Sequence, residues 1–343
     1  MRVGLLTGGG DCPGLNAVIR AAVRKGIEKY KFEMLGIHKG WAGLVCPQAD
    51  PIDLRSVSGI LQRGGTILGT SRTNPAKIDK GFDKCADAFK QLKMDALIAI
   101  GGEDTLGVAN KLAKMGLPII GAPKTIDNDL NATDFTFGFD TAVNIVMEAV
   151  DRLHSTAESH DRVMVVEVMG RHAGWIAVYG GLAGGADYIL IPEEPFDIEE
   201  VCKSLKNRHA RGKNFSIVVA AEGAQPKDAN TFMTKGKELD DFGHVKLGGI
   251  GDALAKEIEK RTGFETRSTV LGHTQRGGSP TAFDRVLGTR FGIAAIDLVA
   301  KKDWGKMVAL QGNKIVAVPL EAAVGTLKTV DKEFFEIAKV FFG

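Results

Sequence analysis

The sequence predicts an α/β protein of two domains, each built from a mostly parallel sheet flanked by helices. Two observations support this fold class. Short runs rich in Val, Ile and Leu alternate with longer segments of helical periodicity, which is typical of parallel sheets covered on both faces. The length of 343 residues and the hydrophobic content of 44% suffice for a substantial core and for two domains.

The expected strands are short apolar runs at residues 3–7, 33–37, 96–100, 118–122, 163–168, 188–191 and 216–221. The expected helices are the longer periodic segments at residues 15–29, 105–114, 141–154, 198–209 and 251–261. Residues 128–139 are rich in turn formers, so one domain could end there. Residues 224–249 are polar and glycine-rich, which indicates a surface insertion or a mobile loop, with a lid or a subunit contact as alternative roles.

Composition and charge exclude several classes of protein. Lys and Arg number 44 against 42 Asp and Glu, so no basic excess suggests nucleic-acid binding. No apolar run is long enough to span a membrane, and residues 1–7 lack the pattern of a signal peptide. The four cysteines are scattered without C-x-x-C spacing, which favours a reducing compartment over a disulfide scaffold or a zinc site. We therefore expect a cytoplasmic protein that binds neither nucleic acid nor membrane.

Glycine and charged residues follow several of the expected strands, where open α/β sheets bind their ligands. The first such turn is Gly8-Gly9-Gly10-Asp11, before the expected helix 15–29. Glycine lets the main chain approach a phosphate closely, and a helix N-terminus favours an anion. The turn is neither a Walker A loop, since no Lys-Ser/Thr follows, nor a good G-x-G-x-x-G, since Pro13 interrupts the pattern. A phosphate loop and a tight strand-to-helix turn are both open.

The second turn, Gly101-Gly102-Glu103-Asp104-Thr105, places two acids after glycine. Acids at a helix N-terminus are ordinarily caps or partners of the helix dipole. They also suit Mg²⁺, which is usually held by one or two carboxylates together with substrate phosphates.

The third turn brings Lys124, Thr125, Asp127 and Asp129 close together in sequence. A plain turn would use Asp here too. A carboxylate close to a cation and a hydroxyl is also what phosphoryl transfer needs, because that chemistry depends on positioning, charge neutralisation and a base.

Five cationic residues lie near the later strand ends. A single arginine is usually a solvated residue or an ion-pair partner, and His273 alone could be a structural histidine. Several of them beside glycine fit a clamp on a phosphate ester better. The five are Arg162, Arg171, Arg267, His273 and Arg276.

With these motifs assembled, the chain resembles the bacterial-type phosphofructokinases over essentially its whole length. The motifs occur in the family's order and at its spacing, and TIDND with MGR and GH-x-QRGG is very specific. The matching segments are residues 6–17 (LTGGGDCPGLNA), 63–66 (RGGT), 101–104 (GGED), 123–129 (PKTIDND), 167–171 (EVMGR) and 271–280 (LGHTQRGGSP).

The resemblance implies a role for each position around the transferred phosphoryl group. Gly10 would bind the donor phosphate through its main chain, and Arg72 would reach the donor phosphates. Glu103 would bind Mg²⁺, the implied cofactor. Asp127 would accept the proton of the sugar 1-hydroxyl, with Thr125 bonded nearby. Asp129 would support either Mg²⁺ or Asp127.

The resemblance also implies a binding site for fructose 6-phosphate. The sugar would be held by Met169, Gly170, Arg171 and Glu222, and its 6-phosphate by Arg162, Arg267, His273 and Arg276. In the family, the residues matching Arg162 and Arg267 come from a neighbouring subunit, so a homodimer or homotetramer is implied. We expect a larger donor-binding domain of residues 1–139 and about 275–325, and a smaller sugar-phosphate-binding domain of residues 140–274 and about 326–343.

Two positions sort the phosphoryl donors of this family. ATP users typically have Gly after the metal-binding acid and often Gly at the position of Lys124, whereas pyrophosphate users have Asp and Lys; a third group has Gly with Lys and uses ATP. This chain has Asp104 and Lys124, so it resembles the pyrophosphate-dependent, mixed-substrate group. A carboxylate at residue 104 would repel the α-phosphate of ATP by about 4 kcal/mol at ~4 Å and an effective dielectric near 20. Asp104 and Lys124 are thus expected beside Asp127 in the catalytic centre of a reversible pyrophosphate-dependent enzyme. The simpler alternatives are a helix N-cap for Asp104 and a surface cation for Lys124.

Several alternatives stay open at this point. One is an ATP-dependent 6-phosphofructokinase with a shifted turn at Asp104, and another is a phosphosugar-binding protein that has lost its chemistry. Other acceptors, such as sedoheptulose 7-phosphate, also remain. Leu54 and His154 stand where the family's effector site commonly has Arg, and Gly59 where it has Asp, which makes control by nucleotides doubtful.

Overall fold

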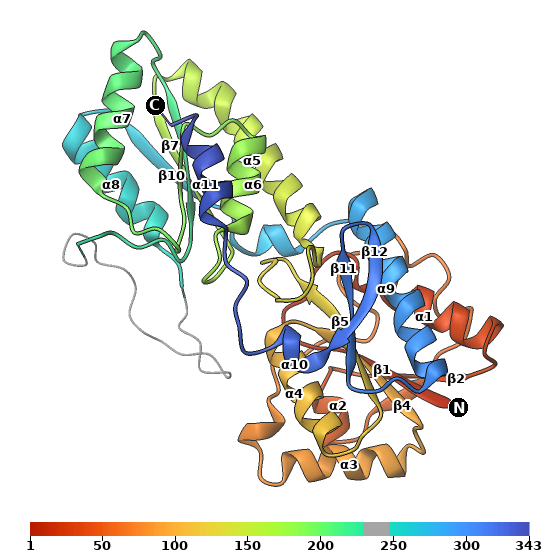
Figure 1. Ribbon diagram of the computed structural model, residues 1–343. Coiled ribbons are helices and arrows are strands. Elements are labelled where there is room, and N and C mark those ends of the chain that lie inside the picture. The colour runs from red at the N-terminus through yellow and green to blue at the C-terminus, as the bar shows by residue number, and fades with distance from the viewer. Residues whose placement is uncertain (229–246, 343) are drawn as a thin grey trace.

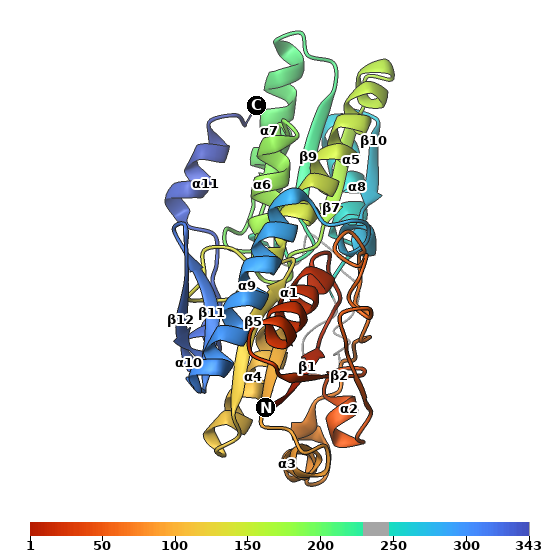
Figure 2. The ribbon, with the colours of Figure 1, turned by 90° about the vertical axis from the view of Figure 1, so that its right-hand side faces the viewer.

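The computed structural model describes residues 1–228 and 247–342. Two sheets lie toward opposite ends of an elongated molecule (Figures 1 and 2). Most of the predicted insertion at 224–249 lies outside the described residues. Among the described residues, no helix is both long and apolar enough to cross a membrane.

The large sheet has a parallel centre and antiparallel edges. Its order is β12-β11-β5-β4-β1-β2-β3, with β6 paired to β5. Strands β2 and β3 pair antiparallel, as do β11 and β12, and the pairs between them are parallel. The strands are β1 (Arg2–Thr7), β2 (Glu33–Ile37), β3 (Ala49–Pro51), β4 (Ala96–Gly101), β5 (Ile119–Thr125), β6 (Phe137–Gly138), β11 (Lys306–Gln311) and β12 (Lys314–Pro319).

Alternate side chains of the central strands face two layers of helices. One layer contains α1 (Leu15–Glu28) and α9 (Ala282–Lys301), which pack against Val3 and Leu5 of β1. The other layer packs against Leu6 of the same strand. It consists of α2 (Ala42–Val45), α3 (Gly81–Gln91), α4 (Glu103–Lys114) and α10 (Leu320–Ala323). This alternation follows from the two-residue period of a strand that is buried on both faces.

The small sheet is parallel throughout, in the order β10-β7-β9-β8. Its strands are β7 (Val163–Val168), β8 (Tyr188–Leu190), β9 (Ser216–Ala221) and β10 (Thr266–Val270). Helices α5 (Phe139–Ser159) and α6 (Trp175–Ala183) cover one face, and α7 (Ile198–Ala210) and α8 (Ile250–Thr262) cover the other. The C-terminal α11 (Lys332–Lys339) packs near α6 and β8 (Figure 1).

Every expected strand and helix forms, and the differences lie at the ends. Helix α4 begins at Glu103 rather than 105, because Gly102 is the N-cap and both acids lie in the first turn. Helix α5 continues from the expected end at 154 to Ser159. The expectations omitted several elements, most notably α9. That helix carries exposed apolar side chains at Phe283, Val286 and Ile293, which blur its amphipathic pattern.

Within the described residues, the chain passes between the two sheets three times: from β6 to α5, from β10 to α9, and from α10 to α11. The first two passages are bonded together at the N-termini of α5 and α9. The main-chain N and Oγ1 of Thr141 donate to Oδ2 of Asp284 (2.8 and 2.6 Å), and Oγ1 of Thr281 donates to Oδ2 of Asp140 (2.6 Å). The division into domains at residues 139, 275 and 325 stays a prediction.

Candidate active site

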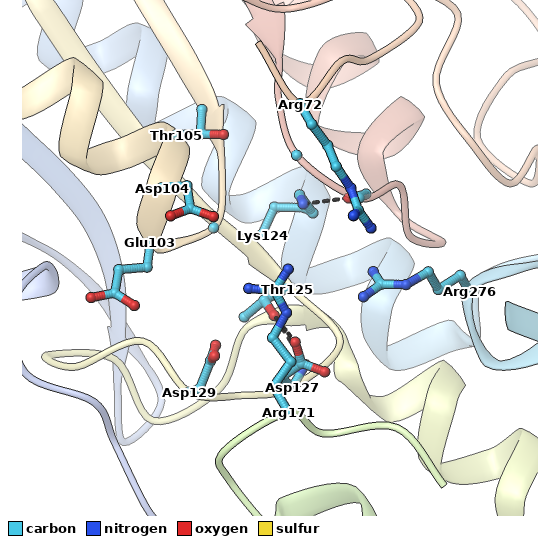
Figure 3. Close-up of a pocket in the computed structure, with 13 residues that line it drawn as sticks. Arg72, Glu103, Asp104, Thr105, Lys124, Thr125, Asp127, Asp129, Arg171 and Arg276 are labelled. Carbon is cyan, nitrogen blue, oxygen red and sulfur yellow. Dashed lines mark hydrogen bonds between the residues drawn. The ribbon is translucent and has the colours of Figure 1, made fainter. Parts of the chain in front are cut away.

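The carboxyl ends of β1, β4 and β5 meet at one cavity, here called the central cavity (Figure 3). Its acids Glu103, Asp104 and Asp129 lie on one side. On the other side, the guanidinium groups of Arg72 and Arg276 point inward. The cavity is lined by Gly9, Gly10, Arg72, Gly102, Glu103, Asp104, Thr105, Lys124, Thr125, Asp127, Asp129, Arg171 and Arg276. Motifs that lie far apart in the sequence thus form one site.

The glycine turn after β1 lets the main chain approach its neighbours closely. Gly9 has a left-handed φ of 78°, and a Cβ at Gly10 would lie only 2.7 Å from Nη1 of Arg276. The turn is bonded to the segment that carries Arg72, because Oγ1 of Thr70 donates to the carbonyl oxygen of Gly9 (2.5 Å). The same arrangement leaves main-chain groups of the turn at the cavity surface, as a phosphate loop requires.

Lys124 lies beneath this turn, where its side chain is only 3% exposed. Its Nζ donates a hydrogen bond of 2.5 Å to the carbonyl oxygen of Gly10. Burial lowers the pKa of Lys124, and the nearby charge of Arg276 lowers it further, whereas Asp127 opposes the shift. The alternative that Lys124 is a surface cation is therefore wrong.

Asp127 is buried and only half satisfied. Its main-chain N donates to Oγ1 of Thr125 (3.0 Å), and that hydroxyl in turn donates to Oδ2 of Asp127 (3.3 Å). The Oδ1 atom has no hydrogen-bond partner among the described residues. A buried carboxylate oxygen without a partner is costly unless a ligand satisfies it. Oδ1 of Asp127 is thus available to accept a hydrogen bond from a substrate hydroxyl.

Carboxylates gather where a magnesium ion would meet donor phosphates. Glu103, Asp127 and Asp129 line the same cavity. Burial and then the charge of Asp127 raise the pKa of Asp129 to about 7, and Arg171 opposes this. No group of three or more metal-ligating side chains is gathered closely enough to hold a metal by itself in the described parts of the chain. The donor set fits Mg²⁺, because that ion uses one or two carboxylates and completes its shell with phosphates and water.

A second cavity of about 270 Å³, the side cavity, brings together three more of the expected residues: Met169, Glu222 and His273. Oε1 of Glu222 accepts a hydrogen bond from the main-chain N of Arg171 (3.1 Å), which connects the side cavity to the central one. Burial, followed by the charge of Asp127, raises the pKa of Glu222. Gly170, at φ 148°, turns the chain between Met169 and Arg171.

The comparison with known proteins agrees with these motifs. Residues 2–299 match the family model described as Phosphofructokinase. The chain belongs to the phosphofructokinase family. It is 60% identical to a protein of Streptomyces coelicolor named pyrophosphate--fructose 6-phosphate 1-phosphotransferase, over the full length of both chains. It is also 52% identical to a second protein of that organism, named ATP-dependent 6-phosphofructokinase 2, again over the full length of both.

Among solved structures, a pyrophosphate-dependent phosphofructokinase from Marinobacter aquaeolei superposes with a TM-score of 0.82. The match covers 97% of this chain and 86% of that one, at 23% sequence identity. This likeness supports the phosphofructokinase fold.

Two expected arginines of this phosphofructokinase, like Gly170, line neither the central nor the side cavity. Arg162 directly precedes β7, Arg267 lies on the neighbouring strand β10, and the two share one acid. Their Nη2 atoms lie 2.8 and 2.6 Å from Oε1 of Glu265. The hydrogen bond from Arg162 lowers the pKa of Glu265. That a neighbouring subunit supplies these arginines stays a prediction.

An outer cavity of about 300 Å³ adjoins the central one. It is lined by Asn74, Ala76, Glu103, Asp104, Gly107, Val108, Lys111, Val324 and Gly325. Glu103 and Asp104 line both cavities, so the first turn of α4 forms the wall between them. Since the N-cap of α4 is Gly102, the alternative that Asp104 is the helix N-cap is wrong.

Sequence reasoning missed Thr105, which packs between two glycine turns. A Cβ at Gly8 or at Gly101 would lie 2.6 or 2.3 Å from atoms of the Thr105 side chain. Thr105 therefore holds the turns after β1 and β4 in register. The only signal was its place next to the acids in the GGEDT segment, and an ordinary residue in the first turn of a helix would look the same in the sequence.

Proposed function

We propose that this phosphofructokinase transfers a phosphoryl group from inorganic pyrophosphate to the 1-hydroxyl of fructose 6-phosphate, and that it also runs in reverse. The products of the forward direction are fructose 1,6-bisphosphate and phosphate. The observation that carries this proposal is the placement of Asp104 and Lys124 at the central cavity. The name of the 60% identical Streptomyces protein supports it.

Asp104 disfavours a nucleotide donor. The outer cavity is the space into which a donor longer than pyrophosphate would extend, and Asp104 stands at its boundary. A phosphate about 4 Å from this carboxylate would be repelled by about 4 kcal/mol at an effective dielectric of 20, which corresponds to roughly a thousandfold in affinity. Pyrophosphate ends on the near side of this wall and avoids the repulsion.

Lys124 and Arg72 favour the anionic donor. The ammonium of Lys124 lies under the main chain of Gly10, which faces the central cavity. Fixed positive charge in a buried site stabilises charge that builds up on the transferred phosphoryl group, since it needs no reorganisation during the reaction. When bound beside Glu103, with Asp129 in support, Mg²⁺ would neutralise further charge on the donor phosphates.

Asp127 is the base for the acceptor hydroxyl. Thr125 fixes one of its carboxylate oxygens, and the unpartnered Oδ1 accepts the proton of the sugar 1-hydroxyl as the O–P bond forms. In the reverse direction, Asp127 returns this proton to the sugar oxygen.

The side cavity and the cations around it would hold the sugar phosphate. Met169, Gly170, Arg171 and Glu222 contact the sugar in this proposal, and His273 and Arg276 bind its 6-phosphate. Arg162 and Arg267 would complete the phosphate site from a second subunit, because neither of them lines the central or the side cavity of its own chain. The working enzyme is thus at least a homodimer in this proposal. We also place it in the cytoplasm, as expected from the sequence.

The deciding measurement is turnover with each donor at equal concentration, with fructose 6-phosphate and Mg²⁺ present. We expect pyrophosphate to support the higher kcat/KM by a factor of at least about ten, which is about 1.4 kcal/mol in transition-state stabilisation. A higher kcat/KM with ATP would overturn the proposal in favour of an ATP-dependent 6-phosphofructokinase, the activity named for the 52% identical relative.

A further inference from the structure

The connection between α10 and α11, residues 324–331, forms a strap that runs from the large sheet to the small one (Figure 1). The strap crosses the loop that follows Asp127. The main-chain N of Lys328 donates to the carbonyl oxygen of Asp129 (2.9 Å), and Leu327 forms an antiparallel bridge with Leu130. The strap thus adds a short piece of sheet to the chain that leads out of the catalytic turn.

The side chain of Lys328 holds the next part of the same loop. Its Nζ donates to the carbonyl oxygens of Thr133 (2.9 Å) and Asp134 (2.6 Å). Between these contacts and Asp129 lies Ala132, whose φ of 64° is left-handed and unfavourable for a residue with a Cβ. Such a conformation persists only where surrounding contacts impose it. Lys328 supplies three of those contacts, one from its main chain and two from its ammonium.

The other side of the strap is bonded to the start of α6, just after the loop that carries Arg171. Nε1 of Trp175 donates to the carbonyl oxygen of Lys328 (2.9 Å), and Nζ of Lys328 lies 5.3 Å from the centre of the Trp175 ring. Two residues further on, the main-chain N of Val330 donates to Oε1 of Glu193 (2.8 Å), which also accepts from Gly174 N (2.9 Å). Gly174 is the N-cap of α6 and Trp175 its first residue, a few residues after Arg171, so Lys328 contacts the loop that follows Asp127 and the start of the helix that follows Arg171.

We infer that Lys328 is a positioning residue, which holds the turn of Asp127 in register with the loop of Arg171. Lys328 lines neither the central nor the side cavity, so it acts through these loops and not on the substrate. The inference rests on the proposed function, in which Asp127 is the base and Arg171 binds the sugar. Phosphoryl transfer depends mostly on positioning, and a displacement of about 1 Å in an active site can lower the rate by roughly a hundredfold.

The test replaces Lys328 by Met, which keeps the length of the side chain and removes its charge and its hydrogen bonds. We expect kcat to fall by about tenfold or more while KM for fructose 6-phosphate changes by less than about threefold, since the loss concerns alignment in the transition state. Lys328→Arg keeps a cation and several donors, so it should recover most of kcat. Lys332→Met is the matched control, because it removes an exposed lysine just beyond the strap and should leave both constants unchanged.

Trp175→Phe tests the other side of the strap, because it removes the indole N–H that donates to Lys328 and keeps a smaller aromatic ring at the contact with the ammonium. We expect Trp175→Phe to lower kcat in the same way. In the double variant with Lys328→Met, the fold-loss in kcat should be smaller than the product of the two single fold-losses, because both substitutions break the same contact. If Lys328→Met does not fold, Trp175→Phe alone decides. A kcat within about twofold of wild type in either folded variant, or a loss confined to KM, overturns the inference. All ratios are taken with the donor that the wild type prefers, so failure of pyrophosphate as donor is seen separately in the wild type.

Discussion

The ammonium of Lys124 donates a hydrogen bond to the main-chain carbonyl oxygen of Gly10 from beneath the glycine turn. This places a buried positive charge directly below the surface on which donor phosphates would lie. Lys124→Met keeps the side-chain length and removes the charge. Since such preorganised groups contribute about 3–4 kcal/mol to the transition state, we expect kcat/KM for pyrophosphate to fall by at least a factor of about 100.

The matched control for Lys124→Met is Lys84→Met, which changes the net charge equally at an exposed position of α3. Its steady-state constants should equal those of the wild type. If the two variants behaved alike, the charge of Lys124 would have no part in donor binding.

Asp104 is expected to determine which donor enters. Asp104→Gly removes both the charge and the bulk of the wall between the central and outer cavities, whereas Asp104→Asn removes the charge alone. We expect the ratio of kcat/KM for ATP to that for pyrophosphate to rise by at least about tenfold in both variants, toward a limit of roughly a thousandfold set by the repulsion. A rise in the Gly variant alone would assign the discrimination to space, and no rise in either would refute the role of Asp104.

Asp127→Asn tests the chemistry itself. The amide cannot take up the hydroxyl proton, so kcat should fall by about 10²–10⁴-fold, the usual contribution of a general base. Binding of fructose 6-phosphate, followed by titration calorimetry, should persist in this variant. Unchanged turnover would instead support the alternative of a phosphosugar-binding protein in which Asp127 has no catalytic role.

If a neighbouring subunit supplies Arg162 and Arg267, as proposed, inactive variants should complement one another. Arg162→Ala and Asp127→Asn should each be nearly inactive alone. Mixed oligomers formed by co-expression contain some sites with an intact Asp127 and an intact partner arginine, so activity should reappear. Mixtures that stay inactive, although mass spectrometry shows both chains in one oligomer, would contradict the shared site.

Asp284, which joins the N-termini of α5 and α9, predicts a dependence of stability on pH. Burial raises the pKa of Asp284 to about 6, and the hydrogen bonds from Thr141 oppose this change. Between about pH 4 and 6, the folded state therefore binds more protons than the unfolded state, and the free energy of unfolding falls as pH rises through this window. The pKa of Asp284 rises from 3.8 to about 6 on folding. Each tenfold difference in proton affinity between the two states corresponds to about 1.4 kcal/mol, so the fall is about 3 kcal/mol at most.

Asp284→Asn removes this titration. The free energy of unfolding, measured by urea denaturation at pH 4, 5, 6 and 7, should show wild type losing stability relative to the variant as pH rises, with the change complete above about pH 6. A difference between the two proteins that is constant from pH 4 to 7 would show that Asp284 has the same pKa in both states.

Much of the central cavity was predictable because its residues follow the strands directly. Gly10, Glu103 and Asp127 line one cavity, since the carboxyl ends of neighbouring parallel strands share one edge of the sheet. The burial of Lys124 and the wall formed by Asp104 depend on packing against distant segments, so sequence alone left their simpler alternatives open. Lys328 meets the catalytic loop from nearly 200 residues away, and no local pattern marks such a contact.

The order of the elements has a consequence for biosynthesis. Residues 139–270 supply the whole small sheet, so this sheet is complete as soon as β10 has emerged from the ribosome. The large sheet must wait, because its strands β11 and β12 and the covering helix α9 all follow β10 in the chain. Until then, β5 lacks its neighbour β11, and α1 lacks the helix that covers it. An unpaired strand edge and an uncovered apolar face favour association with other chains, so we expect the nascent enzyme to be most prone to such association during the final part of its translation.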